Sequence, residues 1–202
     1  PEPEEPTEFT VTFVDGEGNT IATETVQAGA NATLPDTDGV VYTFSPVDAL
    51  YNITESKTIT LGTLDLGTYT NQSFTTNKNQ VVLGGGAQAS SSAGTYLAKA
   101  GTSMTYTATM VGNVKMWYTA TNGSPALQEG DYIALEVKVD GVVVNIIRVS
   151  HAETKLVTLC TLAEYAEHTI VITAIETNIP DAECDRNIKC ARIYSLEYFV
   201  AQ

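Results

Sequence analysis

The fold of this chain is decided by the stretch Tyr132-Ile-Ala-Leu-Glu-Val-Lys-Val139, Asp140-Gly141, Val142-Val-Val-Asn-Ile-Ile-Arg-Val149. Apolar residues occupy every second position of its first half, which is the period of a β-strand with one buried face. Asp-Gly supplies the positive φ angles that a two-residue hairpin turn requires. The stretch therefore predicts an antiparallel β-hairpin with Ile133, Leu135, Val137 and Val139 in the core.

Most other segments from residue 68 onward share this period of two. Further strands are predicted over residues 70–76, 103–110, 114–119, 156–162, 168–174 and 193–200. With the hairpin they give about eight strands at short intervals and no helical period, which is typical of an antiparallel β-sandwich. We therefore expect a mainly β protein.

The chain divides into a short linker and two units. Residues 1–7, Pro-Glu-Pro-Glu-Glu-Pro-Thr, have the composition of a semi-rigid linker, and we expect the chain to be a piece of a longer protein. Strands are predicted in a first unit, residues 8–62, with a turn at Asp15-Gly-Glu-Gly-Asn19. Residues 63–202 form the second unit.

Charge limits the possible partners. The 202 residues include 10 Lys and Arg against 24 Asp and Glu, a formal net charge of −14. Such a chain repels phosphate backbones and anionic lipid, so we expect no nucleic-acid partner. The sequence has no apolar run of about 20 residues, so we expect no membrane insertion by this chain. Few Lys, many Thr and Asn and the linker fit an exported bacterial surface or secreted protein, which we expect to be monomeric.

The three cysteines leave two readings open. Cys184 and Cys190 enclose five residues and either close a small disulfide loop or stay reduced, whereas Cys160 reads as a small core residue. Their spacing and the lack of a nearby His in the sequence do not suit zinc. A structural calcium ion is neither indicated nor excluded.

No catalytic constellation is apparent in the sequence. A G-x-S-x-G elbow is absent, and the chain has only two histidines. His168 reads as a turn-capping or packing residue and His151 as an exposed loop residue. Nothing selects a pair of carboxylates for glycoside hydrolysis. We therefore expect no enzymatic activity, no catalytic residue and no cofactor.

Trp117, the only tryptophan, is the leading candidate for saccharide binding. In the segment 114–119, alternation puts Val114, Met116 and Tyr118 on a core face and Lys115, Trp117 and Thr119 on the more polar face. Pyranose rings stack their C–H faces on aromatic rings, and their hydroxyls need polar groups at the rim. The alternative is a tryptophan covered by a loop or by the first unit.

Other candidates are weaker. Gln88 belongs to the low-complexity stretch 84–94, which reads as a long loop, and Tyr96 follows it. Tyr132 points away from the core face of its strand. Asn122-Gly123 reads as a turn close to Trp117 in the sequence. We read Tyr194 and Tyr198 as core residues. The complete set of predicted saccharide contacts is Trp117, Lys115, Tyr96, Tyr132, Gln88 and Asn122.

The first unit carries a recognisable series of motifs. They are Val11-Thr-Phe-Val-Asp-Gly16, Glu24-Thr-Val26 with Gly29, Tyr42-Thr-Phe44, Asn52-Ile-Thr54 and Thr58-Ile-Thr60. This order resembles the Listeria–Bacteroides surface repeat, also called the internalin B-repeat. The resemblance implies a small β-grasp-like spacer domain of cell-surface proteins without enzymatic activity.

The second unit resembles another family. Lys138-Val-Asp-Gly141, the strand 142–149 and the segment from Leu162 through His168-Thr-Ile-Val-Ile172 are similar to the galactose-binding-like jelly rolls of carbohydrate-binding modules and of accessory domains in bacterial carbohydrate esterases. The resemblance implies a jelly-roll module that binds a polysaccharide without cleaving it. A neutral glycan, such as starch or a plant cell-wall glycan, suits an acidic protein best. The alternatives are a structural or adhesive stalk that binds a protein, and an esterase accessory domain with no binding of its own.

Overall fold

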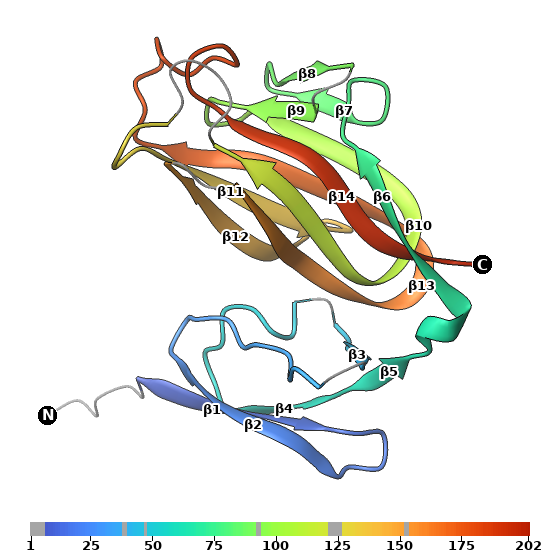
Figure 1. Ribbon diagram of the computed structural model, residues 1–202. Helices are drawn as coiled ribbons and strands as arrows, with labels where there is room; N and C mark the ends of the chain where they lie inside the picture. The colour runs from blue at the N-terminus through green and yellow to red at the C-terminus, as the bar shows by residue number, and fades with distance from the viewer. Residues whose placement is uncertain (1–6, 38–39, 47, 92–93, 121–126, 152–153) are drawn as a thin grey trace, which may run out of the picture.

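The computed structural model describes residues 7–37, 40–46, 48–91, 94–120, 127–151 and 154–202. Its regular elements are β-strands, apart from one 3-10 helix, η1 (Leu66–Thr68). The strands form a small N-terminal unit and a larger sandwich beside it (Figure 1). The predicted mainly β, jelly-roll fold is confirmed. Asn122 lies outside the described residues.

The N-terminal unit has a three-stranded sheet. β1 (Glu8–Val14) pairs antiparallel with β2 (Thr20–Gln27) and parallel with β4 (Lys57–Thr60), while β3 (Val41–Thr43) pairs with β5 (Gly62–Leu64). The turn after β1 is held by Asp15, whose carboxylate accepts a hydrogen bond from the Asn19 amide at 2.8 Å. Val11, Phe13 and Ile53 are fully buried in a core of their own. This unit therefore packs around its own apolar centre.

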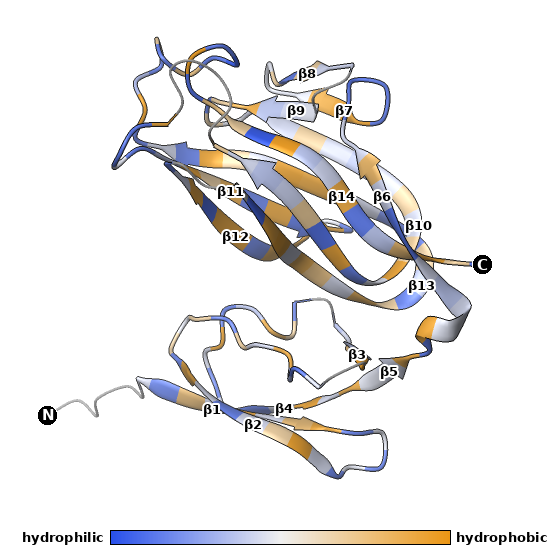
Figure 2. Cartoon of the chain, viewed as in Figure 1, coloured by the Kyte–Doolittle hydropathy of each residue, from blue (hydrophilic) through white to orange (hydrophobic). Residues whose placement is uncertain are grey.

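The larger unit contains all the remaining strands. They are β6 (Tyr69–Thr75), β7 (Val82–Gly84), β8 (Gln88–Ser90), β9 (Gly94–Leu97), β10 (Ser103–Thr119), β11 (Tyr132–Val139), β12 (Val142–Ser150), β13 (Thr154–Thr177) and β14 (Ala191–Ala201). Apolar and polar residues alternate along them, as Figure 2 shows for the long strands. The low-complexity stretch 84–94, predicted to be a loop, contains β8, which pairs with β9.

β10 and β13 each run through both layers of the sandwich. The first half of β10 pairs with the second half of β13 and with β7, whereas its second half pairs with the first half of β13 and with β14. The sequence predicted two strands in place of each, because Val111-Gly112-Asn113 and the segment 163–167 interrupt the apolar alternation. The chain instead bends there and continues pairing. Figure 1 shows these bends next to the N-terminal unit.

Gly112 makes the bend of β10 possible. The register of β10 on β13 shifts between Met110 and Gly112, where the backbone has a φ of +71°. A Cβ atom at Gly112 would lie 3.1 Å from side-chain atoms of both Leu64, on β5, and Phe199, on β14. Because Gly112 has no side chain, Leu64 of the N-terminal unit can pack closely against β10 at this position.

The predicted hairpin is confirmed. β11 pairs with β12 across Asp140-Gly141, whose φ angles are +52° and +85°. The four alternating apolar residues of β11 are fully buried. His168 lies beside the turn: its Nδ1 is 2.7 Å from the Asp140 carboxylate, and its Nε2 is 3.2 Å from the carbonyl oxygen of Glu164. His168 thus anchors a turn, as expected.

Replacing Asp140 with Asn is expected to destabilise the fold in a pH-dependent way. Burial alone would raise the pKa of Asp140, but hydrogen bonds from Thr169 and His168 outweigh it, and the pKa lies below 3.8. A carboxyl with a lowered folded-state pKa stabilises the protein above its unfolded-state pKa and loses this effect as the pH falls through the folded-state value. We expect a loss of about 1 kcal/mol at pH 7, kept small by the exposure of the carboxylate.

Urea unfolding from pH 7 down to pH 2 measures this effect. The difference between wild type and Asp140→Asn should shrink as the pH falls below about 4, because Asp140 of the unfolded wild type takes up a proton at a higher pH than Asp140 of the folded protein. Glu167→Gln removes an exposed carboxylate nearby and is the matched control. A constant difference at every pH would contradict the electrostatic explanation.

Gly112→Ala is expected to destabilise the protein more than Gly101→Ala. Gly101 also has a positive φ, +88°, but a Cβ there would meet nothing within 4 Å. Both changes carry the backbone strain of about 1–2 kcal/mol, and only the first also crowds Leu64 and Phe199. Thermal and urea unfolding measure the loss in free energy of unfolding for each variant. Equal losses would show that crowding of Leu64 and Phe199 adds nothing to the destabilisation by Gly112→Ala.

Candidate functional site

Trp117 lies on the outer side of the layer that contains β14. The alternation predicted for this part of β10 is confirmed, because Val114, Met116 and Tyr118 are buried at 0–1% exposure. Trp117 is 39% exposed, so no described loop or unit covers it completely. Lys115 is half-buried on the same side.

The register of β14 extends this surface. Trp117 is directly opposite Ser195, and Thr119 is opposite Arg192; residues that face each other in an antiparallel pair point to the same side of the sheet. Thr119 shares this side but is only 3% exposed. The register shifts by one residue between these pairs, which accommodates Tyr194 as an extra residue of β14.

Tyr194 is therefore not a core residue, and this sequence prediction is wrong. Its neighbour Ile193 is fully buried, whereas Tyr194 is half-buried with its ring 4.0 Å from the guanidinium carbon of Arg192. Strict alternation of buried and exposed residues would place Tyr194 on the same buried face as Leu196. The bulge adds one residue at this point and so reverses the alternation. Tyr198, at 4% exposure, is confirmed as core and packs near Phe74.

The next two strands bring in Tyr96 and Gln88. Arg192 on β14 faces Tyr96 on β9, which in turn faces Gln88 on β8. The Arg192 guanidinium lies 4.0 Å from the Tyr194 ring centroid and 5.5 Å from that of Tyr96. With strands about 4.8 Å apart, Tyr96 and Trp117 are separated by about 10 Å perpendicular to the strands, and Tyr96 is also displaced along the strands to the level of Thr119.

We call this surface the outer face. It consists of Gln88, Tyr96, Lys115, Trp117, Tyr194, Ser195, Glu197, which lies opposite Lys115, and Arg192, which is only 8% exposed. Four of the six predicted contacts thus share one surface. Sequence reasoning missed its other four members, since only strand pairing shows that β14 lies between β10 and β9.

A groove between the two units continues from the outer face. It has a volume of about 570 Å³, and its walls include Lys115 and Thr158 from the sandwich and Tyr42 from the N-terminal unit. The Tyr51 hydroxyl donates a hydrogen bond of 2.8 Å to the carbonyl oxygen of Leu159 and connects the units beside the groove. Lys115 belongs to both surfaces, so the groove adjoins the outer face at this residue.

Tyr132 lies apart from the outer face. It is on β11, in the other layer, with the Arg148 guanidinium carbon 3.6 Å from its ring centroid. Its hydroxyl donates a hydrogen bond to Glu176, which raises the pKa of Tyr132. The structure therefore does not bring Tyr132 together with Trp117.

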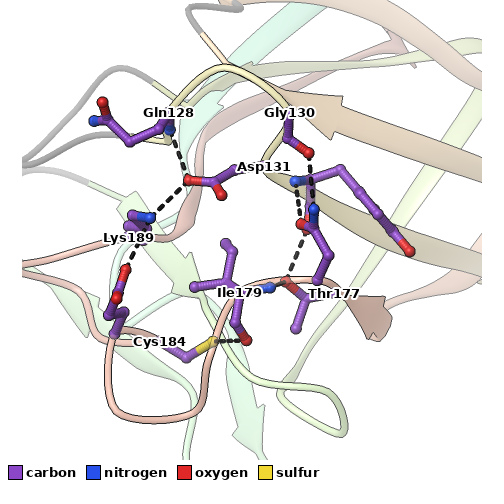
Figure 3. A network of polar contacts seen from close by, with 10 residues as sticks. Gln128, Gly130, Asp131, Thr177, Ile179, Cys184 and Lys189 are labelled. Atoms are coloured by element: carbon purple, nitrogen blue, oxygen red, sulfur yellow. Dashed lines mark hydrogen bonds and ion pairs between the residues drawn. The ribbon is translucent and has the colours of Figure 1, made fainter.

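A polar network holds the loops at one end of the sandwich (Figure 3). The Lys189 ammonium lies 2.8 Å from carboxylate oxygens of both Asp131 and Glu183, and these hydrogen bonds raise its pKa. The Asn178 amide donates to the Gly130 carbonyl at 2.8 Å. The three loops around residues 130, 178 and 183–190 are thereby tied together without a disulfide.

All three cysteines are free and buried. Cys184 donates a hydrogen bond to the Ile179 carbonyl and Cys190 to the Arg186 carbonyl, so the possible bridge between them is not formed. Cys160 is a core residue, as predicted, at 1% exposure. Burial raises the pKa of both Cys160 and Cys190 to about 12.

We expect these thiols to be unreactive in the native protein. A thiol with a raised pKa is almost entirely in its non-nucleophilic form at pH 8, and burial also blocks access. Titration with a chromogenic disulfide should detect essentially no thiol before unfolding and three per chain afterwards. Only one thiol after unfolding would show that Cys184 and Cys190 form a bridge.

In the described residues, no group of three or more His, Cys, Asp or Glu side chains is placed to hold a metal ion. No helix within the described ranges is long and apolar enough to span a membrane.

Comparison with known proteins finds similarity in structure only. No family model and no curated protein matches the chain. A two-domain esterase active on acetylated mannans, co-crystallised with mannopentaose, matches with a TM-score of 0.50 and 19% identity over 70% of this chain and 39% of its own. This likeness shows the fold alone.

Two further solved structures are similar at lower scores. A family two carbohydrate esterase from Cellvibrio japonicus has a TM-score of 0.47 and 12% identity over 66% of this chain and 35% of its own. The CBM36-1 domain of a multidomain xylanase from the hindgut metagenome of Trinervitermes trinervoides has a TM-score of 0.43 and 13% identity over 66% of this chain and 98% of that domain. The chain thus spans well under half the length of the matched esterases.

Proposed function

We propose that this chain is a non-catalytic polysaccharide-binding module of a bacterial cell-surface or secreted multimodular protein. One observation carries the proposal: strand register gathers the exposed Trp117, the rings of Tyr194 and Tyr96, and polar side chains on one outer face. A water-facing indole beside hydrogen-bonding groups matches the two-sided chemistry of a sugar, which has apolar ring faces and polar edges. Binding there requires no bond to be broken.

The outer face suits an extended glycan. Trp117 would stack on the C–H face of one pyranose, while Lys115, Glu197 and Ser195 offer hydrogen bonds to its hydroxyls. β10 is paired on both sides, so the backbone that carries Lys115 and Trp117 is ordered before a ligand arrives, which reduces the entropy lost on binding. The groove at Lys115 would hold further sugars of the same chain.

The context of the module belongs to the same proposal. Residues 8–62 would serve as a B-repeat-like spacer domain and residues 63–202 as the binding domain, in an extracellular, monomeric module without a cofactor. The two separate apolar cores support this division. Starch and plant cell-wall glycans are the first ligands to examine, and the resemblance of the second unit to carbohydrate-binding modules supports that choice.

Trp117→Ala is expected to weaken glycan binding at least about ten-fold, equivalent to about 1.4 kcal/mol. The physical reason is the loss of the exposed ring on which the sugar stacks. Affinity gel electrophoresis against starch, xylan and mannan would identify the ligand, and isothermal titration calorimetry with its oligosaccharide would give the affinities.

Tyr165→Ala is the matched control for this experiment. Tyr165 is an aromatic residue of similar exposure, 44%, but it lies at the bend of β13 beside Tyr69. Its removal should leave glycan binding unchanged. Equal affinity of wild type and Trp117→Ala would remove Trp117 from the site, and turnover of a bound glycan would overturn the non-catalytic proposal.

A second candidate function is a stalk that binds a protein partner. Val142, Val143 and Ile146 of the edge strand β12 are 39%, 41% and 58% exposed. Val143 and Ile146 also line a cavity of about 1030 Å³ between β12 and the N-terminal unit. Exposed apolar groups of this kind are typical of interaction surfaces. The esterase accessory domain remains the third alternative and would bind no glycan alone.

A further inference from the structure

A small cavity adjoins the outer face at Tyr96 and Gln88. This cavity, of about 190 Å³, is lined by residues that include Gly85, Gln88, Tyr96, Lys99 and Arg186. Tyr96 and Gln88 are thus walls of the cavity and members of the outer face at the same time. A glycan that extends from Trp117 across Tyr96 would place its end here.

The cavity carries two cations in a strongly acidic chain. Among the described residues, neither the Lys99 ammonium nor the Arg186 guanidinium forms an ion pair, whereas the nearby Lys189 is held by two carboxylates. One carboxylate, that of Asp185, also lines the cavity, and its Oδ1 accepts a hydrogen bond of 2.8 Å from the Asn187 amide of its own loop. The cavity therefore holds one net positive charge.

Two consecutive glycines, Gly85 and Gly86, line the cavity. Gly85 has a φ of +61°, and a Cβ atom there would lie 1.9 Å from the carbonyl oxygen of Gly101, so only glycine fits this position. Gly86 follows with a φ of +81°. The backbone of Gly101 fills the space beside Gly85, whereas a Cβ at Gly86 would meet nothing within 4 Å, so a ligand can approach the main chain at Gly86.

We infer that this cavity is a terminal subsite for an acidic sugar, whose carboxylate is bound by Arg186 and Lys99 while Tyr96 and Gln88 contact its ring. The guanidinium is planar and matches a carboxylate through two parallel hydrogen bonds. This inference rests on the proposed function and names its substrate class: a glycan that bears uronic acid. The net charge of the chain predicts a neutral glycan. The subsite predicts an acidic one, because a carboxylate bound there would contact Lys99 and Arg186 directly.

The test compares one glycan in two charge states. Glucuronoxylan, polygalacturonate and alginate are each offered intact and with their carboxylates reduced to primary alcohols, which removes the charge and keeps the sugar backbone. The wild-type protein should bind at least one intact glycan about ten-fold more tightly than its reduced form, and 0.5 M NaCl should diminish this preference.

The double variant Lys99→Ala, Arg186→Ala should lose the preference and bind both forms of that glycan equally. Lys78→Ala, which removes an exposed cation elsewhere, should keep it. Lys99 and Arg186 are also exposed, so the double variant should fold, and its melting temperature checks this. Dextran sulfate is the further arm that separates a carboxylate site from a general anion site.

Each contrary result has a distinct meaning. Equal binding of intact and reduced glycans by the wild type, with Trp117→Ala still weakening both, would overturn the subsite and leave the proposed function standing. A preference that survives in the double variant would also overturn it. Dextran sulfate binding that depends equally on Lys99 and Arg186 would overturn the carboxylate assignment, and no glycan binding at all would overturn both proposals.

Discussion

The structure depends on one constraint, which is that β10 and β13 stay paired while both bend from one layer of the sandwich into the other. Their first and second halves thereby enclose a single apolar core, with Met104 and Leu162 fully buried in it. Gly112 allows the bend and the contact with the N-terminal unit at the same place. Because the second half of β10 then pairs with β14, the same bend decides which side chains accompany Trp117.

The outer face shows how a sheet can gather aromatic and polar side chains without contributions from long loops. Alternation sends every second side chain outward, and pairing aligns those side chains across four strands. A single bulge adds Tyr194 to the set and places its ring against Arg192, which also faces Tyr96. Backbone hydrogen bonds on both sides of β10 and β14 fix the strands that carry these side chains.

Charge acts here on two length scales. The net charge of −14 governs solubility and long-range encounters, which salt screens within about 8–10 Å. A ligand bound at the end of the outer face instead experiences Lys99, Arg186 and Asp185 directly. A chain that repels polyanions at a distance can therefore still hold a carboxylate at one point, which net charge alone does not reveal.

Alternation and turn chemistry act between neighbouring residues, so the sequence was enough to predict most of the long pairing segments, the Asp140-Gly141 hairpin and the position of Trp117 on the polar face of its strand. It also identified Tyr96 and Gln88 as candidates, without showing that they adjoin the same surface. The sequence did not show that Tyr194 leaves the core, that β10 and β13 are continuous, or that the Arg192 guanidinium lies near the rings of both Tyr96 and Tyr194; these follow from the folded arrangement. These features depend on register between strands far apart in the chain, which local patterns do not encode.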